Sequence, residues 1–355
     1  MNKLITTFLN LVKIDSPTGS EDKIINYLND LLISFGFKPF KDKFGNLIIN
    51  INGFGQPLFL SAHVDTVEPG KNINPIIRNG IIRSDGKTIL GADNKAALAA
   101  IVELLRKISE DKIQTKRLNI VFTKSEESGN FGAVNLNYKK INSKEGYIFD
   151  NATPIGTIIT ASPFYNRIDI KIIGKASHAS RPRDGINVIN VFNNAMKKNK
   201  LGSINSKTII NIGFLQAGDA RNTIPGEMIM KGEIRSFFED DIDKYSKSII
   251  NAFKDSAKKF GAKIETSLVR ENPGYEYKSS DSLIEKTKKI MNANGIVPVL
   301  KKNYGCSDAN IFVGNSIKVI NLGNGAVGAH TREEYISSYD LQKLYKLILS
   351  LATSK

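Results

Sequence analysis

The sequence predicts an α/β fold, a mixed sheet with helices on both faces, interrupted by a small inserted α+β domain. Three observations lead to this prediction. Strand-like and helical patterns alternate over the first 160 residues, the order of elements changes in the middle of the chain, and the alternation returns after Pro273. A length of 355 residues also favours two domains over one. We expect the α/β domain to comprise residues 1–162 and 273–355, and the insert to comprise residues 163–272.

The first part of the α/β domain contains helices and strands in turn. Apolar residues recur at helical spacing in residues 2–13, 20–35 and 92–109. The third of these segments contains AALAAIVELLRKI, which is apolar on most faces and therefore predicts a buried helix. The expected strands are residues 45–51 (GNLIINI), 57–62 (PLFLSA), 117–123 (RLNIVFT) and 146–149 (GYIF).

The insert begins with a strand that is apolar on one face. In residues 166–173 (NRIDIKII), Ile168, Ile170 and Ile172 share that face. The next expected elements are a helix at 185–198, strands at 207–215 and 226–236, a helix carrying Ile242, Tyr245, Ile249, Phe253 and Phe260, and a strand at 262–269. This order is βαββαβ, the ferredoxin-like split unit. After the insert we expect a helix at 281–294, a strand at 317–322 and a helix at 339–351.

The net charge of +15 reflects 50 Lys and Arg residues against 35 Asp and Glu residues. Only 11 of the basic residues are Arg, and basic runs are no longer than pairs such as Lys139-Lys140. Nucleic-acid-binding proteins more often carry a clustered basic face or a recognisable module. Since Lys, Asn and Ile are all abundant, compositional bias explains the charge, and we expect no nucleic-acid partner.

The single cysteine, Cys306, excludes an internal disulfide and a CxxC pair for zinc or redox chemistry. No segment approaches the ~18 consecutive apolar residues that span a bilayer. The apolar run near the N-terminus is interrupted by Asn10 and lacks a small-x-small cleavage site, which favours an amphipathic helix over a signal peptide. We therefore expect a cytoplasmic protein without a membrane partner, in which the available imidazole ligands are His63, His178 and His330.

Residues able to bind metal ions follow several of the predicted strands. In open α/β sheets, ligands bind at the carboxyl ends of strands, where residues far apart in the sequence meet. The candidate group consists of His63, Asp65, Asp93, Glu126, Glu127, Asp150 and His330. His and carboxylate ligands without thiolate fit two divalent cations such as zinc, cobalt or manganese.

The spacing within this group suggests a division of roles. His63 and Asp65 share one face of an extended segment, so Asp65 can hold the imidazole ring in place. Asp93 is the candidate for the carboxylate that bridges two metals ~3.5–4 Å apart. Of the adjacent Glu126 and Glu127, one can bind metal while the other accepts a proton from a metal-activated water.

Each of these residues also has a simpler interpretation. A single loop histidine is usually exposed or packed, adjacent glutamates are usually solvated, and Asp150 before Asn-Ala-Thr-Pro also fits a turn. Two of the three histidines and all of these acids nevertheless lie near the ends of predicted elements. That coincidence favours a metal site over separate surface residues.

Eight sequence blocks carry a family resemblance, in the order SAHVDTVEPG, GADNKAALAAI, FTKSEESGNFGA, YIFDNATPIGTI, GKASHASRPRDGINVI, ARNTIPGEMIMKGEIRS, GCSDANIF and GAHTREEYIS. They resemble the M20-type dinuclear metallopeptidases, and most of all the peptidase T-like (tripeptide aminopeptidase-like) branch. The resemblance runs from LVKIDSPTGSE to the last helix and covers essentially the whole chain. It implies a zinc-exopeptidase-type sheet with an inserted dimerisation domain.

The resemblance also implies a ligand set. His63 and Asp150 bind one zinc ion, Glu127 and His330 bind the other, and Asp93 bridges both. The family uses either Asp or Glu at the position of Asp150. Asp resembles the aminopeptidase and dipeptidase side of the family, whereas Glu resembles the carboxypeptidase and deacylase side.

By the same resemblance, Glu126 is the general base and then the general acid, and Asp65 orients His63. The family often has an acidic residue where this chain has Asn94. Because this position does not supply a metal ligand, we expect metal binding to be kept.

Residues of the insert and the segment near Cys306 complete the candidate set. His178 is either an ordinary turn histidine or, by resemblance, an oxyanion stabiliser that is often supplied to the neighbouring subunit. Arg235 is either a solvated edge residue or, by resemblance, recognises the terminal carboxylate of a short peptide together with Asn222. A guanidinium group matches a carboxylate in geometry and charge. The resemblance places Ser307 in the lining of the pocket. Cys306 is expected to be a small buried or pocket-lining residue, since no histidine remains to activate it.

The sequence therefore predicts a two-zinc exopeptidase that releases the N-terminal residue of short peptides. A metal-activated hydroxide attacks the scissile carbonyl after Glu126 takes its proton, and the insert forms a homodimer. An N-acyl amino acid deacylase or a carboxypeptidase on the same scaffold is the alternative. A non-catalytic binding protein is a more distant one.

Overall fold

The computed structural model describes residues 2–354, which divide into two compact units. The larger unit comprises Met1–Thr160, Tyr277–Asn303 and Ser307–Lys355. The inserted unit comprises Ala161–Glu276 together with Tyr304–Cys306.

The larger unit contains both short and long elements. Its helices are α1 (Lys3–Val12), α2 (Asp22–Ser34), α3 (Ala92–Asp111), α4 (Phe131–Val134), α7 (Ser282–Ala293), α8 (Asp308–Gly314) and α9 (Ser338–Thr353). Its strands are β1 (Phe40–Lys41), β2 (Leu47–Ile51), β3 (Phe54–His63), β4 (Ile76–Arg78), β5 (Ile81–Arg83), β6 (Lys116–Thr123), β7 (Glu145–Ile148), β17 (Val299–Lys302), β18 (Lys318–Leu322) and β19 (Tyr335–Ser337). Strand β8 (Thr157–Ser162) continues into the inserted unit.

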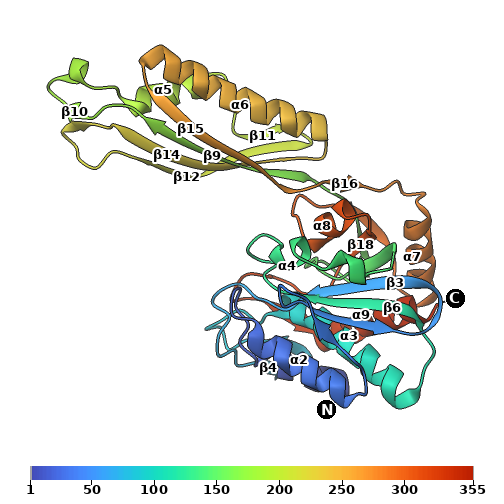
Figure 1. Cartoon of the computed structure of the whole chain (residues 1–355). Coiled ribbons are helices and arrows are strands. Elements are labelled where there is room, and N and C mark those ends of the chain that lie inside the picture. The colour runs from blue at the N-terminus through green and yellow to red at the C-terminus, as the bar shows by residue number, and fades with distance from the viewer. Residues whose placement is uncertain (1, 355) are drawn as a thin grey trace. The chain divides into compact units, whose positions relative to one another are not determined.

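The central sheet is mixed, with a parallel middle (Figure 1). Its strands lie in the order β1-β2-β6-β3-β7-β18-β8-β16, where β16 is Tyr275–Glu276, and β17 pairs with β8. Strands β6, β3, β7 and β18 are parallel neighbours. Strands β2 and β8 run antiparallel to β6 and β18. The four parallel strands therefore end at the same edge of the sheet.

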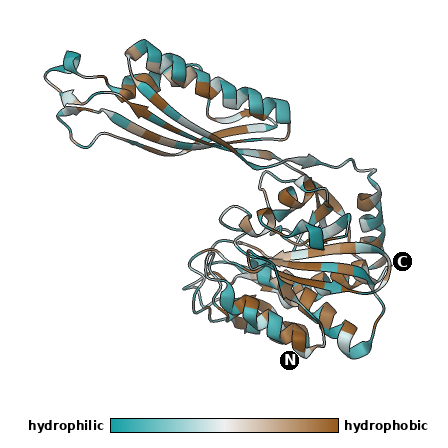
Figure 2. Cartoon of the chain, in the orientation of Figure 1, coloured by the Kyte–Doolittle hydropathy of each residue, from teal (hydrophilic) through white to brown (hydrophobic). Residues whose placement is uncertain are grey.

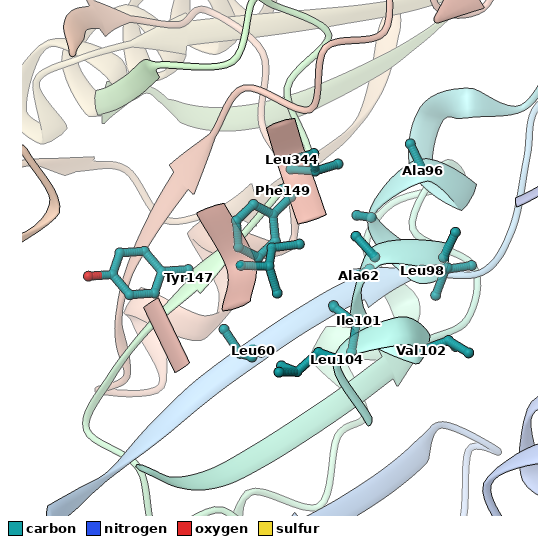
Figure 3. Close-up of a cluster of buried hydrophobic side chains, with 14 of the residues drawn as sticks. Leu60, Ala62, Ala96, Leu98, Ile101, Val102, Leu104, Tyr147, Phe149 and Leu344 are labelled. Carbon is teal, nitrogen blue, oxygen red and sulfur yellow. The ribbon is translucent and has the colours of Figure 1, made fainter. Parts of the chain in front are cut away.

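Helices pack on both faces of this sheet. Successive residues of a strand point to opposite faces, so Phe59 and Leu60 of β3 contact different helices. Leu60 lies in the cluster that contains Ile101 of the buried helix α3 (Figure 3). The ring of Phe59 lies 4.7 Å from that of Phe312 in α8, in a T-shaped contact. The Ala- and Leu-rich stretch of α3 from Ala96 to Leu105 suits its position, because every residue of this stretch is buried.

The inserted unit is a twisted sheet with two helices. Its helices are α5 (Val188–Met196) and α6 (Glu239–Phe260), and its strands are β9 (Phe164–Ile173), β10 (Ser177–His178), β11 (Gly202–Asn205), β12 (Thr208–Ala217), β13 (Thr223–Ile224), β14 (Glu227–Ser236) and β15 (Lys263–Asn272). The five-stranded sheet has the order β11-β12-β14-β9-β15, and all of its pairs are antiparallel. The short strands β10 and β13 pair with each other.

The core of the inserted unit lies between this sheet and its helices. Ile168, Ile170 and Ile172 of β9 are buried in one cluster with Phe253 of α6, as the alternation in their segment predicts. Figure 2 shows that much of α6 is hydrophilic, as expected for a helix with one face on a sheet and one in water.

The predicted fold class is confirmed. Each expected helix and strand is present, and the ends that were predicted lie within about three residues of those observed. Strand β11 adds an edge strand to the βαββαβ unit. When the remaining strands β9, β12, β14 and β15 are numbered 1 to 4 along the chain, their order in the sheet is 2-3-1-4, which is that of a ferredoxin-like sheet.

Short elements were not predicted. Strands β4, β5 and β19 form a separate three-stranded sheet, and α8 has seven residues. Such segments are too short to show a period, and pairing with distant segments stabilises them. Within residues 2–354, none of the helices is long and apolar enough to cross a bilayer.

Candidate metal centre

The ends of the parallel strands bring predicted site residues together. His63 ends β3 and lies opposite Thr123, which ends β6. Glu126 and Glu127 follow β6, and Asp150 follows β7. Because β6, β3 and β7 are parallel neighbours, the loops that follow them meet at one edge of the sheet.

The ring of His63 is held from one side and faces carboxylates on the other. Nδ1 lies 3.1 Å from the backbone oxygen of Asp65 and 3.4 Å from its Oδ1. Nε2 lies 3.4 Å from Asp150 Oδ1 and 3.7 Å from Asp93 Oδ1. Both contacts with Asp65 lie on the Nδ1 side of the ring and leave Nε2 available as a ligand atom.

Asp93 lies between the two histidines of the cluster. Its Oδ1 faces Nε2 of His63 at 3.7 Å, and its Oδ2 faces Nε2 of His330 at 3.8 Å. The same nitrogen of His330 lies 2.8 Å from Oε1 of Glu127. One carboxylate therefore faces both halves of the cluster, which is the arrangement that a bridging ligand needs.

The crowded carboxylates perturb one another. Burial raises the pKa of Glu126 and of Asp150, and nearby negative charges raise both further. Burial alone would lower the pKa of His63, but Asp150 and the other carboxylates outweigh it and raise that pKa well above its usual value. The hydrogen bond with Glu127 raises the pKa of His330 to about 9. This excess of negative charge is of the kind that bound cations neutralise.

The donors of the cluster fit two divalent cations. Ligand atoms of His63, Asp93 and Asp150 lie within 4.8 Å of one another, and so do those of His63, Glu126 and Glu127. Oδ2 of Asp150 is buried and has no hydrogen-bond partner in the part of the chain that the structure describes. A buried polar atom left without a partner is readily explained as a metal ligand. Imidazole and carboxylate donors suit zinc, cobalt and manganese.

Asp65 holds more than the imidazole ring. Its Oδ1 accepts a hydrogen bond from the backbone N–H of Glu126 at 3.0 Å, and its Oδ2 accepts one from that of Glu127 at 3.1 Å. The hydroxyl of Thr18 donates to the same Oδ2 at 2.8 Å. Burial alone would raise the pKa of Asp65, but His63 and these donors keep it below its usual value. Asp65 thus links His63 to both glutamates.

Several residues that hydrogen-bond to the cluster were not predicted. Asn324 donates to Oδ1 of Asp93 at 3.2 Å. Asn321 accepts from the backbone N–H of Asp150 at 3.0 Å and donates to its carbonyl at 2.8 Å. Glu334 accepts from the backbone N–H of Asp93. The sequence offered a signal for Asn321, because it is a polar residue inside the apolar strand KVINL. It offered none for Glu334, which the sequence does not distinguish from the adjacent Glu333.

Two of the other predicted site residues lie in the inserted unit. His178 is exposed in β10, with Nδ1 2.7 Å from the hydroxyl oxygen of Ser180. The carbonyl of Asn222 accepts from the backbone N–H of Ala179 at 2.8 Å. The roles of both residues toward substrate stay predictions.

Arg235 is already engaged in the inserted unit. Its Nε and Nη2 donate to the two oxygens of Glu233 at 3.2 and 3.1 Å, and its Nη1 donates to the carbonyl of Tyr304 at 3.0 Å. The guanidinium also lies 4.6 Å from the centre of the Tyr165 ring. A substrate carboxylate would therefore compete with Glu233 for the guanidinium group of Arg235.

Ser307 and Cys306 lie where the chain passes between the two units. The hydroxyl of Ser307 accepts from the backbone N–H of Ala309 at 3.3 Å and from the amide of Asn321 at 3.1 Å, and so caps α8. Cys306 is partly buried, with Sγ 3.6 Å from the carbonyl oxygen of Pro163.

Known proteins resemble this chain along its whole length. The sequence profile of Peptidase family M20/M25/M40 matches residues 59–354. The chain is 32% identical to the aminopeptidase PepT of Bacillus cereus, covering 99% of this chain and 97% of that one, with a TM-score of 0.92. A tripeptidase structure from Staphylococcus aureus is 33% identical, with the same coverage and a TM-score of 0.95. The protein YqjE of Bacillus subtilis is 32% identical over 98% of this chain and 97% of its own length.

These findings confirm the family and the metallo-exopeptidase class that the sequence blocks predict. The matched range also includes both histidines and all five carboxylates of the cluster, from His63 to His330. The chain therefore belongs to Peptidase family M20/M25/M40.

Proposed function

We propose that this protein releases the N-terminal residue of short peptides by two-metal hydrolysis. One observation carries the proposal: the two oxygens of Asp93 face His63 and His330, with the carboxylates of Glu127 and Asp150 beside them. Likeness to the Bacillus cereus aminopeptidase PepT and the Staphylococcus aureus tripeptidase supports action on the N-terminal side of short substrates. Aspartate rather than glutamate at position 150 supports the same choice.

Five residues would hold the cations. His63 and Asp150 would bind one, Glu127 and His330 the other, and Asp93 both, with zinc as the preferred metal and cobalt or manganese as alternatives. When bound, the cations supply Lewis-acid polarisation of a carbonyl and lower the pKa of a water molecule to ~7.

Glu126 moves the proton in this proposal. Its carboxylate accepts a proton from the attacking water and returns it to the amine that leaves as the peptide C–N bond breaks. Asp65 supports this role because it binds the backbone N–H groups of Glu126 and Glu127. The two neighbouring side chains can then serve different tasks, one on a metal and one on the substrate.

Residues outside the cluster would bind the rest of the substrate. Arg235 and Asn222 would recognise the terminal carboxylate, and Ser307 would line the pocket. His178 would stabilise the oxyanion at the site of a neighbouring subunit, where a fixed donor acts on the charge that develops during attack. The exposure of His178 supports a role at a site outside its own surroundings.

A homodimer through the inserted unit belongs to the same proposal. Phe214 and Leu215 of β12 and Leu268 and Val269 of β15 are exposed apolar residues on strands of that unit. Strand β15 also lies at the edge of its sheet. Exposed apolar residues and a sheet edge favour a contact with a second chain.

Digestion of a peptide library tests the function directly. The purified protein is incubated with Zn²⁺, Mn²⁺ or Co²⁺ and with free tripeptides, N-acetyl amino acids and N-blocked dipeptides, and the products are read by mass spectrometry. Release of the N-terminal residue from free tripeptides is expected. Cleavage of only the N-acetyl or N-blocked substrates would establish the deacylase or carboxypeptidase alternative. A protein that binds no metal and cleaves none of these substrates would contradict the proposal and favour the alternative of a non-catalytic binding protein.

The location is a separate part of the proposal. A chain whose one cysteine forms no internal disulfide suits the reducing cytoplasm. Cell fractionation with an antibody against the protein tests this, and recovery outside the cytoplasm would contradict it.

A further inference from the structure

The carboxylate of Glu126 is held by a side chain outside the ligand set. Nδ2 of Asn130 donates to Oε1 of Glu126 at 2.9 Å. The same nitrogen donates to Oδ1 of Asp308 at 3.2 Å. The two N–H bonds of one amide thus join Glu126, which follows β6, to Asp308, the first residue of α8.

Asp308 is itself fixed in place. It is 3% exposed, and its Oδ2 accepts from the hydroxyl of Thr123 at 2.6 Å. Thr123 ends β6, and Ser307 caps the helix that Asp308 begins. Both oxygens of Asp308 therefore act as acceptors, Oδ2 from Thr123 at the end of β6 and Oδ1 from Asn130.

The backbone also places Asn130 over Glu126. The N–H of Asn130 donates to the carbonyl of Glu126 at 2.8 Å, which closes a turn of five residues. Asn130 has a φ of +58°, in the left-handed region where Asn is one of the few tolerated side chains. Its side chain is buried. The turn thus brings the amide back to the carboxylate of the residue that starts it.

An amide beside a carboxylate can present either its NH₂ group or its oxygen, and only NH₂ holds the carboxylate. Asp308 selects one of these two orientations of the Asn130 amide. Its carboxylate accepts a hydrogen bond and donates none, so the NH₂ group, and not the amide oxygen, faces Asp308 and Glu126. With Oε1 of Glu126 occupied in this way, Oε2 is left for exchange of a proton.

We propose that Asn130 and Asp308 are positioning residues that hold Glu126 in the orientation needed for proton transfer. The inference rests on the proposed function, since it requires Glu126 to be the general base. It assigns neither residue to metal or to substrate. Its expected signature is a loss in turnover while metal content and substrate binding are kept.

Three single variants separate these effects. Asn130→Gly keeps the left-handed backbone and removes the amide, Asn130→Asp keeps the shape and replaces a donor by an acceptor, and Asp308→Asn removes the acceptor that orients the amide. For each variant we expect kcat to fall about 10- to 100-fold, less than the whole contribution of a general base at about 10²–10⁴-fold. KM should stay within about twofold and two metal ions per chain should remain bound. Asn79→Gly, which also replaces a left-handed Asn, is the control and should leave kcat unchanged.

A swapped pair distinguishes positioning from a structural role. In Asn130→Asp combined with Asp308→Asn, the two side chains can still bond to each other, but residue 130 no longer donates to Glu126. We expect the melting temperature to return toward the wild-type value while kcat stays low. Recovery of kcat together with stability would overturn the proposal.

Crystal structures of the wild type and of Asn130→Gly, grown with Zn²⁺, give a readout independent of activity. We expect the carboxylate of Glu126 to lie in one orientation in the wild type and to rotate or lose order in the variant. An unchanged Glu126 with unchanged kcat overturns the positioning role even when the wild type cleaves peptides. A wild type that cleaves no peptide, with a displaced Glu126 in the variant, instead overturns the proposed function and leaves the contact between Asn130 and Glu126 established.

Discussion

The carboxylate of Glu334 accepts a hydrogen bond from the backbone N–H of Asp93 at 2.9 Å. Its oxygens also accept from the N–H groups of Leu90 and Gly91 at 2.9 and 2.6 Å. Glu334 follows His330 by four residues, so this one side chain ties the segment that precedes Asp93 to the loop that carries His330. Two of the proposed metal ligands are therefore positioned together.

Glu334→Ala should weaken metal binding and stability at the same time. The change leaves three backbone N–H groups with no acceptor, at ~1–3 kcal/mol for each buried donor that finds no other partner. Loss of such a supporting contact typically lowers metal affinity about 10- to 100-fold. Zinc titration by calorimetry and urea unfolding measure the two effects. The exposed neighbour Glu333, changed to Ala, is the control, and equal zinc affinities for the two variants would contradict the prediction.

Glu126→Gln should abolish most of the activity but keep the metals. Gln has the shape of Glu yet cannot accept the proton, so we expect kcat to fall about 10²–10⁴-fold. Elemental analysis should still find two metal ions per chain, because Glu126 is not among the proposed ligands. Turnover near the wild-type value would exclude Glu126 as the base.

That the acidic and imidazole side chains of the site lie close together could be predicted, because their residue types and their positions after strands can be read from the sequence. His63 ends an apolar strand, whereas Glu126, Glu127 and Asp150 follow such strands. Parallel strands bring these residues to one edge of the sheet. The side chains that hydrogen-bond to these residues cannot be recognised in the same way from residue type and position. Asn130, for example, acts through a left-handed turn whose geometry the sequence does not display.

The fold, like the site, was predicted in part. Long elements such as α3 and β9 have clear periods and were predicted with ends close to those observed. The three-residue strands β4, β5 and β19 were not, because each is defined by its partners rather than by its own pattern. Strand β11 was missed for the same reason, since it forms by pairing with β12.

Arg235→Ala should impair binding of peptides with a free carboxylate. A hydrogen bond to a charged group contributes ~1.5–3 kcal/mol, so KM for a free tripeptide should rise at least about 10-fold. KM for the corresponding tripeptide amide should change little, because it has no terminal charge to recognise. Lys231→Ala, on the same strand, is the control. An equal rise in KM for the acid and the amide would indicate a structural role for Arg235, consistent with its bonds to Glu233 and Tyr304.

Mixing two inactive variants tests whether His178 acts between subunits. A heterodimer of His178→Ala and Glu126→Gln contains one site with both native residues if His178 is supplied by the partner. Random exchange should therefore restore about one quarter of the wild-type activity. The doubly substituted chain mixed with His178→Ala is the control and should stay inactive. Absence of recovery after exchange is verified by mass spectrometry would argue against the role between subunits.

Lys116 should make stability depend on pH above neutrality. Burial, with the nearby charge of Lys286, lowers the pKa of Lys116 to about 8 in the folded chain, against about 10.5 when it is exposed. Between these two values the unfolded chain binds more protons, so the free energy of unfolding rises with pH, by at most ~1.4 kcal/mol per pH unit from this residue. Below pH 8 both states are protonated and the buried charge is a constant cost.

Lys116→Met should thus flatten the rise in the free energy of unfolding between pH 8 and 10.5, measured by urea unfolding, whereas Met at the exposed Lys87 should not. The hydrogen bonds of Lys116 to Ser354 and to the carbonyl of Leu351 are lost in the variant at every pH. The test is therefore the slope of the free energy of unfolding against pH, and an unchanged slope in Lys116→Met would contradict the prediction.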